Sequence, residues 1–244
     1  MYTIPYRLLV VKLPTGDDNR GMMKRGDELS QHILWSAKEV FMEMGFERAS
    51  MDEVARHAHT SKRSLYAHFE NKEKLFLAVI NMVRSQFLAG LGSPGDYSTK
   101  PVEALTLFCA RYLEFAFYVG GIRMCRMIMA EAERFPLGAA QWFDVIYTQV
   151  HARLAAYLQK TFPLNSRQSA QAAEWMLGRV LFPRFIRTLF GVDHPYPRID
   201  PSAPTPTIDV RPVRRAVQDV LDSLRLTSEN IVGAAPKVRA VKGN

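Results

Sequence analysis

Three residues that readily cap helices, Ser50, Ser61 and Asn71, follow one another at intervals of about ten positions. Ser50 with Glu53 fits a capping box, in which the serine hydroxyl accepts from a backbone amide of the first turn and the glutamate bonds back to the serine amide. These intervals leave room only for short helices. The chain is therefore expected to form a short helix after Ser50, a break, a second short helix that ends at His68, and a further helix after Asn71.

Helical periodicity continues on both sides of these short segments. From 27 to 44 the apolar residues recur at steps of three and four, and Gly45 fits the C-terminal cap of that helix. After Asn71 an apolar stripe runs until Gly90. Four helices are thus expected within residues 27–92, with the short pair in the middle arranged as a helix-turn-helix.

The rest of the chain is also helical by pattern, and strand-like alternation is nearly absent. Pro183 is expected to kink its helix, and residues 191–212, which hold six of the fourteen prolines, predict an extended loop that is either disordered or covers a partner subunit. Helices are expected at 101–118, 121–133, 137–160, 166–190 and 211–225.

The expected fold class is all-α, with an N-terminal three-helix helix-turn-helix domain and a C-terminal helical domain for ligand binding and dimerisation. A chain of 244 residues is long enough to form such cores without disulfide staples. The expected division is a loose arm at 1–25, the first domain at 26–92, the second at 93–228 and a flexible tail at 229–244.

The short helix after Ser61 is expected to present hydrogen-bond donors outward. Ala55 is small enough for the two short helices to cross closely, and six helical residues rise about 9 Å, which suits a major groove about 12 Å wide. The alternatives are an ordinary solvated face for the charges and a half-buried core position for Tyr66. The residues predicted to contact DNA are Ser50, Thr60, Ser61, Lys62, Arg63, Ser64, Tyr66, His68 and Lys72.

At these residues the chain resembles the DNA-binding domain of TetR-type transcriptional regulators. The Leu65-Tyr66-x-x-Phe69 segment, followed by Asn71-Lys72-Glu73, carries the resemblance, which extends over about 27–85. The segment at 129–136 resembles the AefR-like subgroup of these regulators.

The chain departs from the family pattern in its turn. His59 stands where the family usually has glycine, and Thr60 stands where it usually has valine. Histidine tolerates a positive φ better than most other residues, so the turn is expected to form at some strain.

The resemblance implies a regulator, most often a repressor, that binds palindromic operator DNA as a homodimer. It also implies that a small-molecule effector enters the helical domain and releases the operator. A regulator of this kind is expected in the cytoplasm, and the resemblance implies no cofactor. The rival interpretation is a non-specific nucleic-acid or anionic-surface binding protein that uses net charge alone.

Apolar faces of the second domain supply candidates for the dimer interface and for the effector pocket. The residues predicted at the dimer interface are Ala173, Met176, Leu177, Val180, Val213, Val217, Val220 and Leu224. The residues predicted to line a pocket for a hydrophobic or aromatic effector are Phe108, Tyr112, Phe115, Met127, Trp142, Tyr147, His151 and Trp175, with plain core packing as the alternative for each.

Composition narrows the choice of function classes. The formal net charge of +8 and the pI of about 9.6 favour a polyanionic partner. No uncharged apolar run approaches the roughly 20 residues of a membrane span, so no membrane association is expected. The absence of a glycine-rich phosphate loop, a nucleophile elbow and paired carboxylates indicates that the chain is not an enzyme and has no catalytic residues.

The histidines and the two cysteines lack metal-site spacing, so no metal is expected. Two cysteines without a disulfide framework fit a reducing cytoplasm. Cys125 lies near Arg123 and Arg126, which leaves open a depressed thiol pKa and a redox-sensing role.

Overall fold

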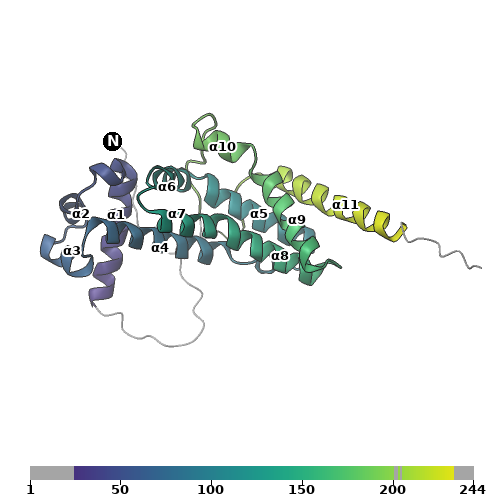
Figure 1. The fold of residues 1–244 in the computed structure, drawn as a ribbon, viewed down its shortest axis with the longest axis horizontal. Coiled ribbons are helices and arrows are strands. Elements are labelled where there is room, and N and C mark those ends of the chain that lie inside the picture. The colour runs from purple at the N-terminus through teal and green to yellow at the C-terminus, as the bar shows by residue number, and fades with distance from the viewer. Residues whose placement is uncertain (1–24, 201–202, 204, 234–244) are drawn as a thin grey trace, which may run out of the picture.

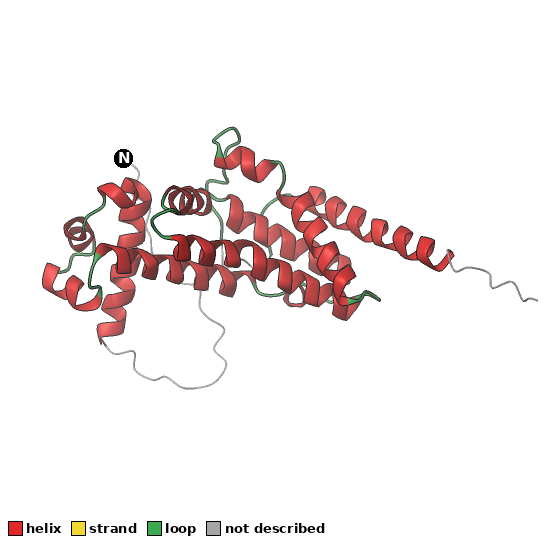
Figure 2. Ribbon diagram, in the orientation of Figure 1, coloured by secondary structure: helices red, strands yellow, loops and turns green. Residues whose placement is uncertain are grey.

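The computed structural model describes residues 25–200, 203 and 205–233. Within these ranges the regular structure is helical (Figure 2). A single isolated bridge joins Tyr118 and Tyr196. The expected all-α fold is thereby confirmed. Figure 1 shows an elongated molecule with helices α1 to α3 at one end and α11 at the other. Of the expected N-terminal arm at 1–25, all but Arg25 lies outside the described residues.

Of the four N-terminal helices, the last three begin where the capping residues predict. The four helices are α1 (Arg25–Arg48), α2 (Met51–His57), α3 (Lys62–His68) and α4 (Lys72–Leu91). The Ser50 hydroxyl accepts from the Glu53 amide at 3.1 Å, the Ser61 hydroxyl from Ser64 at 3.0 Å, and the Asn71 carboxamide oxygen from Lys74 at 2.8 Å. Local side-chain acceptors therefore set all three helix starts.

Two local details differ from the expectation. The reciprocal half of the capping box at Ser50 is not made, because the Glu53 carboxylate pairs with Arg56 instead. Gly45 ends the first, long part of α1 as expected, with φ at 76° and ψ at 167°, but a short helical segment follows this kink and continues to Arg48. Glycine permits this left-handed step without a Cβ clash.

An aromatic cluster joins the two domains. The rings of Phe46 and Phe76 lie 4.9 Å apart between centroids, and Phe135, from the turn between α6 and α7, lies 4.8 Å from Phe46 and 5.1 Å from Phe76. The guanidinium of Arg134 lies over the Phe46 ring and pairs with Glu47. The start of α7 is thereby packed directly on the end of α1.

The C-terminal domain is a layered bundle. Its elements are η2 (Pro94–Asp96), α5 (Pro101–Phe117), α6 (Val119–Ala130), α7 (Pro136–Phe143), η3 (Asp144–Thr148), α8 (Gln149–Thr161), α9 (Ser166–Leu181), α10 (Arg184–Leu189) and α11 (Arg211–Gly233). Figure 1 shows α4 running from the helix-turn-helix end alongside α7 and α8 of this bundle.

Three helices expected in the C-terminal domain differ in more than the one to three residues by which the ends of α5 and α6 differ from the expected bounds. The single helix expected at 137–160 contains a π-helical turn at Asp144–Thr148. The helix expected at 166–190 is broken at Pro183 rather than kinked, because proline has no amide hydrogen to donate. The last helix extends to Gly233, so residues 229–233, expected in the tail, are helical, while 234–244 lie outside the described residues.

The residues predicted at the dimer interface lie mostly inside the single chain. Ala173, Met176, Leu177 and Val217 are fully buried, Val213 and Val220 are nearly so, and Val180 and Leu224 pack on the same core. This prediction is wrong for the buried positions. The apolar stripes of α9 and α11 pack against each other, and α5 completes this part of the core.

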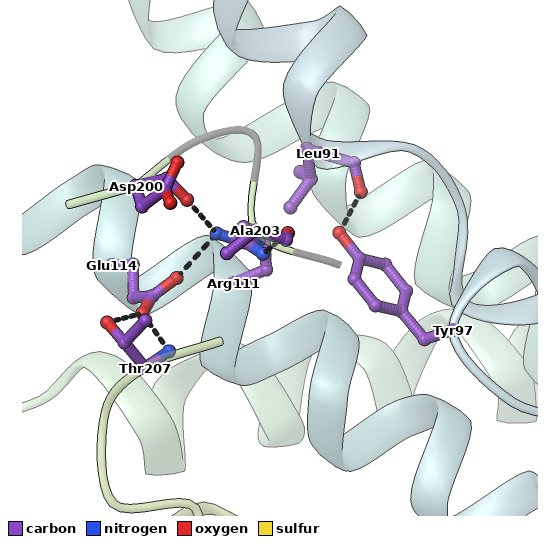
Figure 3. A network of polar contacts seen from close by, with 7 residues as sticks. All are labelled: Leu91, Tyr97, Arg111, Glu114, Asp200, Ala203 and Thr207. Atoms are coloured by element: carbon purple, nitrogen blue, oxygen red, sulfur yellow. Dashed lines mark hydrogen bonds and ion pairs between the residues drawn. The ribbon is translucent and has the colours of Figure 1, made fainter. Parts of the chain in front are cut away.

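The proline-rich segment after α10 is held against α5 by a buried ion pair. Arg111 donates to Glu114 at 2.8 Å and to the Asp200 carbonyl at 3.1 Å, and its second terminal nitrogen bonds the Ala203 carbonyl (Figure 3). The Thr207 hydroxyl donates to the Glu114 carboxylate at 2.7 Å. The described part of the loop is thus bound to its own subunit.

By length and mean hydropathy α4 is the one described helix that passes as a membrane span. Its apolar stripe is instead used for packing: Leu75, Phe76, Val79 and Ile80 are buried in the core with α1. Arg84 places a charge in the run of apolar residues between this buried part and the end of the helix. We therefore interpret α4 as a core helix that links the two domains.

Candidate nucleic-acid interface and effector cavity

The turn between α2 and α3 has the strained geometry predicted at His59. Its φ is 49°, the one positive value for a non-glycine residue in the described part of the chain. The Thr60 amide donates to the Ala55 carbonyl at 3.0 Å, and Ala55 is buried where the helices cross. The histidine therefore occupies the left-handed position without losing the turn.

Helix α3 is anchored on one side and exposed on the other. Leu65 is fully buried, whereas Lys62, Arg63 and His68 are exposed and Tyr66 is 50% exposed. The alternative that Tyr66 belongs to the core therefore fails. Ala67, which the sequence reasoning did not select, lies exposed on the same short helix.

The two cations of α3 differ in their partners. The Lys62 ammonium lies 2.6 Å from the Asp52 carboxylate, and both side chains are exposed. Within the described residues no carboxylate pairs with Arg63. Arg63 is therefore the cation of α3 whose charge is not already offset by the protein.

The hydroxyl groups predicted to contact DNA lie around the start of α3. Ser61 is exposed and its hydroxyl lies 2.9 Å from that of Ser64. Ser50 is exposed at the start of α2, and Thr60 is half-buried in the turn. Two of these hydroxyls already cap helices: that of Ser50 caps α2 and that of Ser61 caps α3.

Lys72 does not point its charge outward. Its ammonium donates to the carbonyl oxygens of Phe46 at 2.9 Å, Ala49 at 3.0 Å and Glu47 at 3.2 Å. An ammonium has three donors, and all three are used here. In this structure Lys72 therefore caps the carbonyl end of α1, and the predicted contact with a DNA phosphate would require these bonds to break.

A cavity of about 70 Å³ lies where α1 and α4 meet the C-terminal helices. Three of the residues proposed for an effector pocket, Tyr112, Phe115 and Trp142, are among its lining residues. The other lining residues are Trp35, Lys38, Met42, Val83, Gln86, Phe87, Ala116, Tyr118, Gly120, Gly121, Met124, Cys125, Ile146, Phe185 and Ile199.

Five predicted pocket residues lie elsewhere. Phe108 is core and packs edge-on against Tyr97, and Met127 lines a separate cleft beside α1. Tyr147 stacks between Phe143 and His151, and the His151 ring hydrogen-bonds the Ala170 carbonyl. Trp175 is 41% exposed on α9. The apolar side chains of these residues indicated that this region is largely buried. They did not indicate which helix faces enclose the cavity.

The sequence reasoning missed the contribution of α1. Trp35, Lys38 and Met42 are three and four positions apart, so they share one face of that helix, and all three line the cavity. The opposite face supplies Ile33 and Val40 to the core of the N-terminal domain. The spacing of the apolar residues between 33 and 42 could have indicated that both faces of this helix are partly buried.

Cys125 has no redox-sensing environment. The thiol is buried, and the Trp142 indole nitrogen donates to its sulfur at 3.4 Å. Burial raises the pKa of Cys125 to about 11 despite this hydrogen bond. Arg123 and Arg126 are exposed on the same helix, and the idea that they depress the thiol pKa is wrong. Among the residues that the structure describes, no cluster of histidine, cysteine or acidic side chains is placed to hold a metal.

Two protein-family models match this chain, one in each of its domains. The family model described as bacterial regulatory proteins, tetR family, matches residues 33–79, and the model of the AefR-like transcriptional repressor C-terminal domain matches 103–203. Together they span more than half of the chain.

One curated relative is the HTH-type transcriptional activator FasR of Mycolicibacterium smegmatis, which is 39% identical over 80 residues. This match covers 33% of the chain and 36% of FasR, so the chain spans about a third of this relative's length.

Two solved structures share the fold over most of the chain. A TetR-family regulator from Mesorhizobium loti superposes with a TM-score of 0.65 at 20% identity, over 83% of this chain and 98% of that one. The flavonoid-responsive regulator FrrA superposes with a TM-score of 0.62 at 22% identity, over 82% and 96% of the two chains. The proteins of this family are transcriptional regulators rather than enzymes. With its helix-turn-helix and its AefR-like helical domain, this chain belongs to the TetR family of bacterial transcriptional regulators.

Proposed function

We propose that the chain is a cytoplasmic repressor that binds a palindromic operator as a homodimer and is released by a small hydrophobic or aromatic effector. The division into a reading domain at 26–92 and an effector domain at 93–228 is part of this proposal. The observation that carries it is the pairing of an exposed, cationic α3 with an aromatic cavity whose walls come from both domains.

In this proposal α3 lies in the major groove. The unpaired guanidinium of Arg63 contacts base edges or phosphates. The Lys62 ammonium does the same after it leaves the Asp52 carboxylate. Tyr66 and His68 have short, rigid reach and bind phosphate oxygens. The hydroxyls of Ser50, Thr60, Ser61 and Ser64 supply further contacts to the backbone.

A single short helix reads too few bases for specific binding, so two copies are needed. Because the predicted interface residues are buried, we assign the dimer contact to the outward side of α9 and α10. Trp175 lies on α9, Phe182 in the break between α9 and α10, Ile186 on α10 and Phe190 directly after α10. All four are exposed apolar side chains, which a dimer would cover.

Phe182→Glu is expected to yield monomers in light scattering and to weaken operator binding. Leu137→Glu, at an exposed apolar position on α7, is the matched control that leaves the dimer intact. Dimers of unchanged stability in the Phe182 variant would assign the interface elsewhere.

Release follows from the position of the cavity. The lining residues Val83 and Phe87 belong to α4, which carries the reading head, whereas Tyr112 and Trp142 belong to the effector domain. An effector that fills the space favours a state in which α4 shifts, and the spacing of the two reading heads then no longer matches the grooves. A coupling of about 1 to 3 kcal/mol changes operator affinity about 5- to 150-fold.

The test is selection of bound genomic DNA followed by gel-shift titration at fixed salt. Operator affinity is expected to exceed that for random DNA by about 10³-fold or more. Arg63→Ala should remove most of this difference, whereas Lys74→Ala, on an exposed lysine paired with Glu70, should not. Equal affinity for both DNAs would support the rival, a non-specific binder of anionic surfaces.

A further inference from the structure

The effector cavity has one charged residue in its wall. Of its lining residues, all within the described part of the chain, Lys38 alone is ionic. Most of the others are apolar, and Trp35, Phe87, Tyr112, Phe115 and Trp142 give the cavity aromatic walls. A cation in the wall of an aromatic cavity suits a ligand that has an anionic group at one end and an apolar ring at the other.

The Lys38 ammonium is poorly satisfied by the protein. Its side chain is 12% exposed, and its nitrogen lies 4.2 Å from the centre of the Trp35 ring and 3.0 Å from the Glu39 carboxylate. Apart from Glu39, no residue that the structure describes supplies it with an oxygen acceptor. An ammonium removed from water to this extent is costly unless acceptors surround it.

Glu39 is an exchangeable partner. It is the next residue on α1, and neighbouring helical side chains diverge by about 100°, so the pair forms only when both side chains bend toward each other. Glu39 also keeps 27% of its side chain exposed, which lets the carboxylate return to water at little cost. A ligand carboxylate can therefore take its place at Lys38.

We infer that the effector is an aromatic carboxylate whose ring lies among the cavity aromatics and whose carboxylate displaces Glu39 from Lys38. This inference rests on the proposed function and adds the ligand class. It also makes α1 a direct ligand-binding element. Because Ile33 and Val40 on the other face of α1 are buried in the reading domain, the bound acid acts on that domain without an intermediate helix.

The size of the cavity explains how the ligand would act. Its volume of about 70 Å³ is roughly half of the 150 Å³ that admits a benzene ring into an engineered apolar cavity. A ring therefore enters only if α1 and α4 move away from α5 and α6. The carboxylate holds Lys38 while the ring widens the joint between the two domains.

The experiment compares 3-phenylpropanoate with its neutral analogue 3-phenylpropanamide at constant ionic strength. Trp175→Phe keeps an apolar aromatic side chain at the proposed dimer contact and leaves Trp35 and Trp142, both in the cavity wall, as fluorescent reporters. Quenching of this background protein by each compound measures binding, and neither compound absorbs where tryptophan is excited at long wavelength.

We expect the acid to bind at least about tenfold more tightly than the amide. Lys38→Met should abolish this preference by weakening acid binding while leaving amide binding within about twofold. Glu39→Gln should strengthen acid binding several-fold, because it removes the competing carboxylate. The matched variants Lys74→Met and Glu70→Gln change an exposed ion pair at the start of α4 and should alter neither affinity.

Equal affinities for acid and amide, an unresponsive Glu39→Gln variant, or no binding of the acid at millimolar concentration would each overturn the inference. Retained amide binding shows that the Lys38 variant keeps its cavity. Gel shifts with the operator form a separate arm. If the acid binds through Lys38 but leaves the operator complex intact, the proposed release mechanism is wrong and the inferred ligand class stands. If the protein binds no operator, the proposed DNA-binding function is wrong, and the fluorescence titration still tests the ligand class.

Discussion

The ammonium of Lys72 lies 2.9 Å from the carbonyl oxygen of Phe46, 26 residues earlier in the chain. The first turn of α4 thereby holds the last turn of α1, whose carbonyl groups have no partners within their own helix. Lys72 also lies over the Phe46 ring at 4.3 Å. A lysine within the motif that carries the family resemblance therefore has a structural task, and its place beside α3 in sequence does not put its charge on the DNA surface.

Lys72→Met is expected to lower the free energy of unfolding by about 1 to 3 kcal/mol, because three carbonyl groups lose a charged donor. Denaturant titration measures this. The salt dependence of operator affinity should keep its slope, since no phosphate contact is lost. A slope reduced by about one unit with unchanged stability would instead place Lys72 on a phosphate.

Arg63 and Asp52 should affect DNA affinity in opposite directions. Arg63→Ala removes an unpaired cation and should weaken binding and reduce the slope of log affinity against log salt by about 0.9. Asp52→Asn frees Lys62 and should strengthen binding to any duplex. Gel shifts over a salt series test both, and a weaker complex in the Asp52 variant would show that the ion pair positions Lys62 for binding.

Gly121→Ala should destabilise the protein by about 1 to 3 kcal/mol. A methyl group at this position would overlap the Phe115 carbonyl oxygen, which is backbone and cannot rotate away, and would crowd the Tyr118 ring. Gly26→Ala is the control, because its methyl group would make only an ordinary contact with His68. The melting temperatures of both variants test this prediction. Equal values would contradict the close packing of Gly121 against the Phe115 backbone.

Arg111→Met should cost about 3 to 5 kcal/mol, since it leaves the fully buried Glu114 without its cation. The double variant with Glu114→Met should recover much of this loss, because no unpaired charge then remains. Urea unfolding of both variants forms the measurement. Limited proteolysis should show faster cleavage near Arg198 in the single variant, and unchanged cleavage would mean that the ion pair does not hold the loop.

The two thiols should be unreactive below about pH 9. Burial raises the pKa of Cys109 to about 12 and that of Cys125 to about 11, from an ordinary value near 9. A raised acid pKa favours the folded protein while the thiol is protonated, so this contribution is complete below pH 9 and is lost as the pH rises through 11. Reaction with a thiol reagent at pH 8 should require unfolding; rapid labelling of the native protein would contradict the burial.

The local features of the reading domain were determined by the sequence alone. The starts of α2, α3 and α4 and the left-handed turn at His59 follow from interactions across a few neighbouring residues. A cap or a turn depends on the residues next to it, so its geometry is written in a short segment.

Only the tertiary structure decided which partner each helix face meets. The stripe of Ala173 and Met176 is apolar whether it contacts another subunit or its own α11, and the fold chose the latter. The same holds for Lys72, which found carbonyl groups of α1, and for Lys38, which lies in a cavity wall. Periodicity states that a face is buried; the long-range packing that names its neighbour depends on how all the helices fill space together.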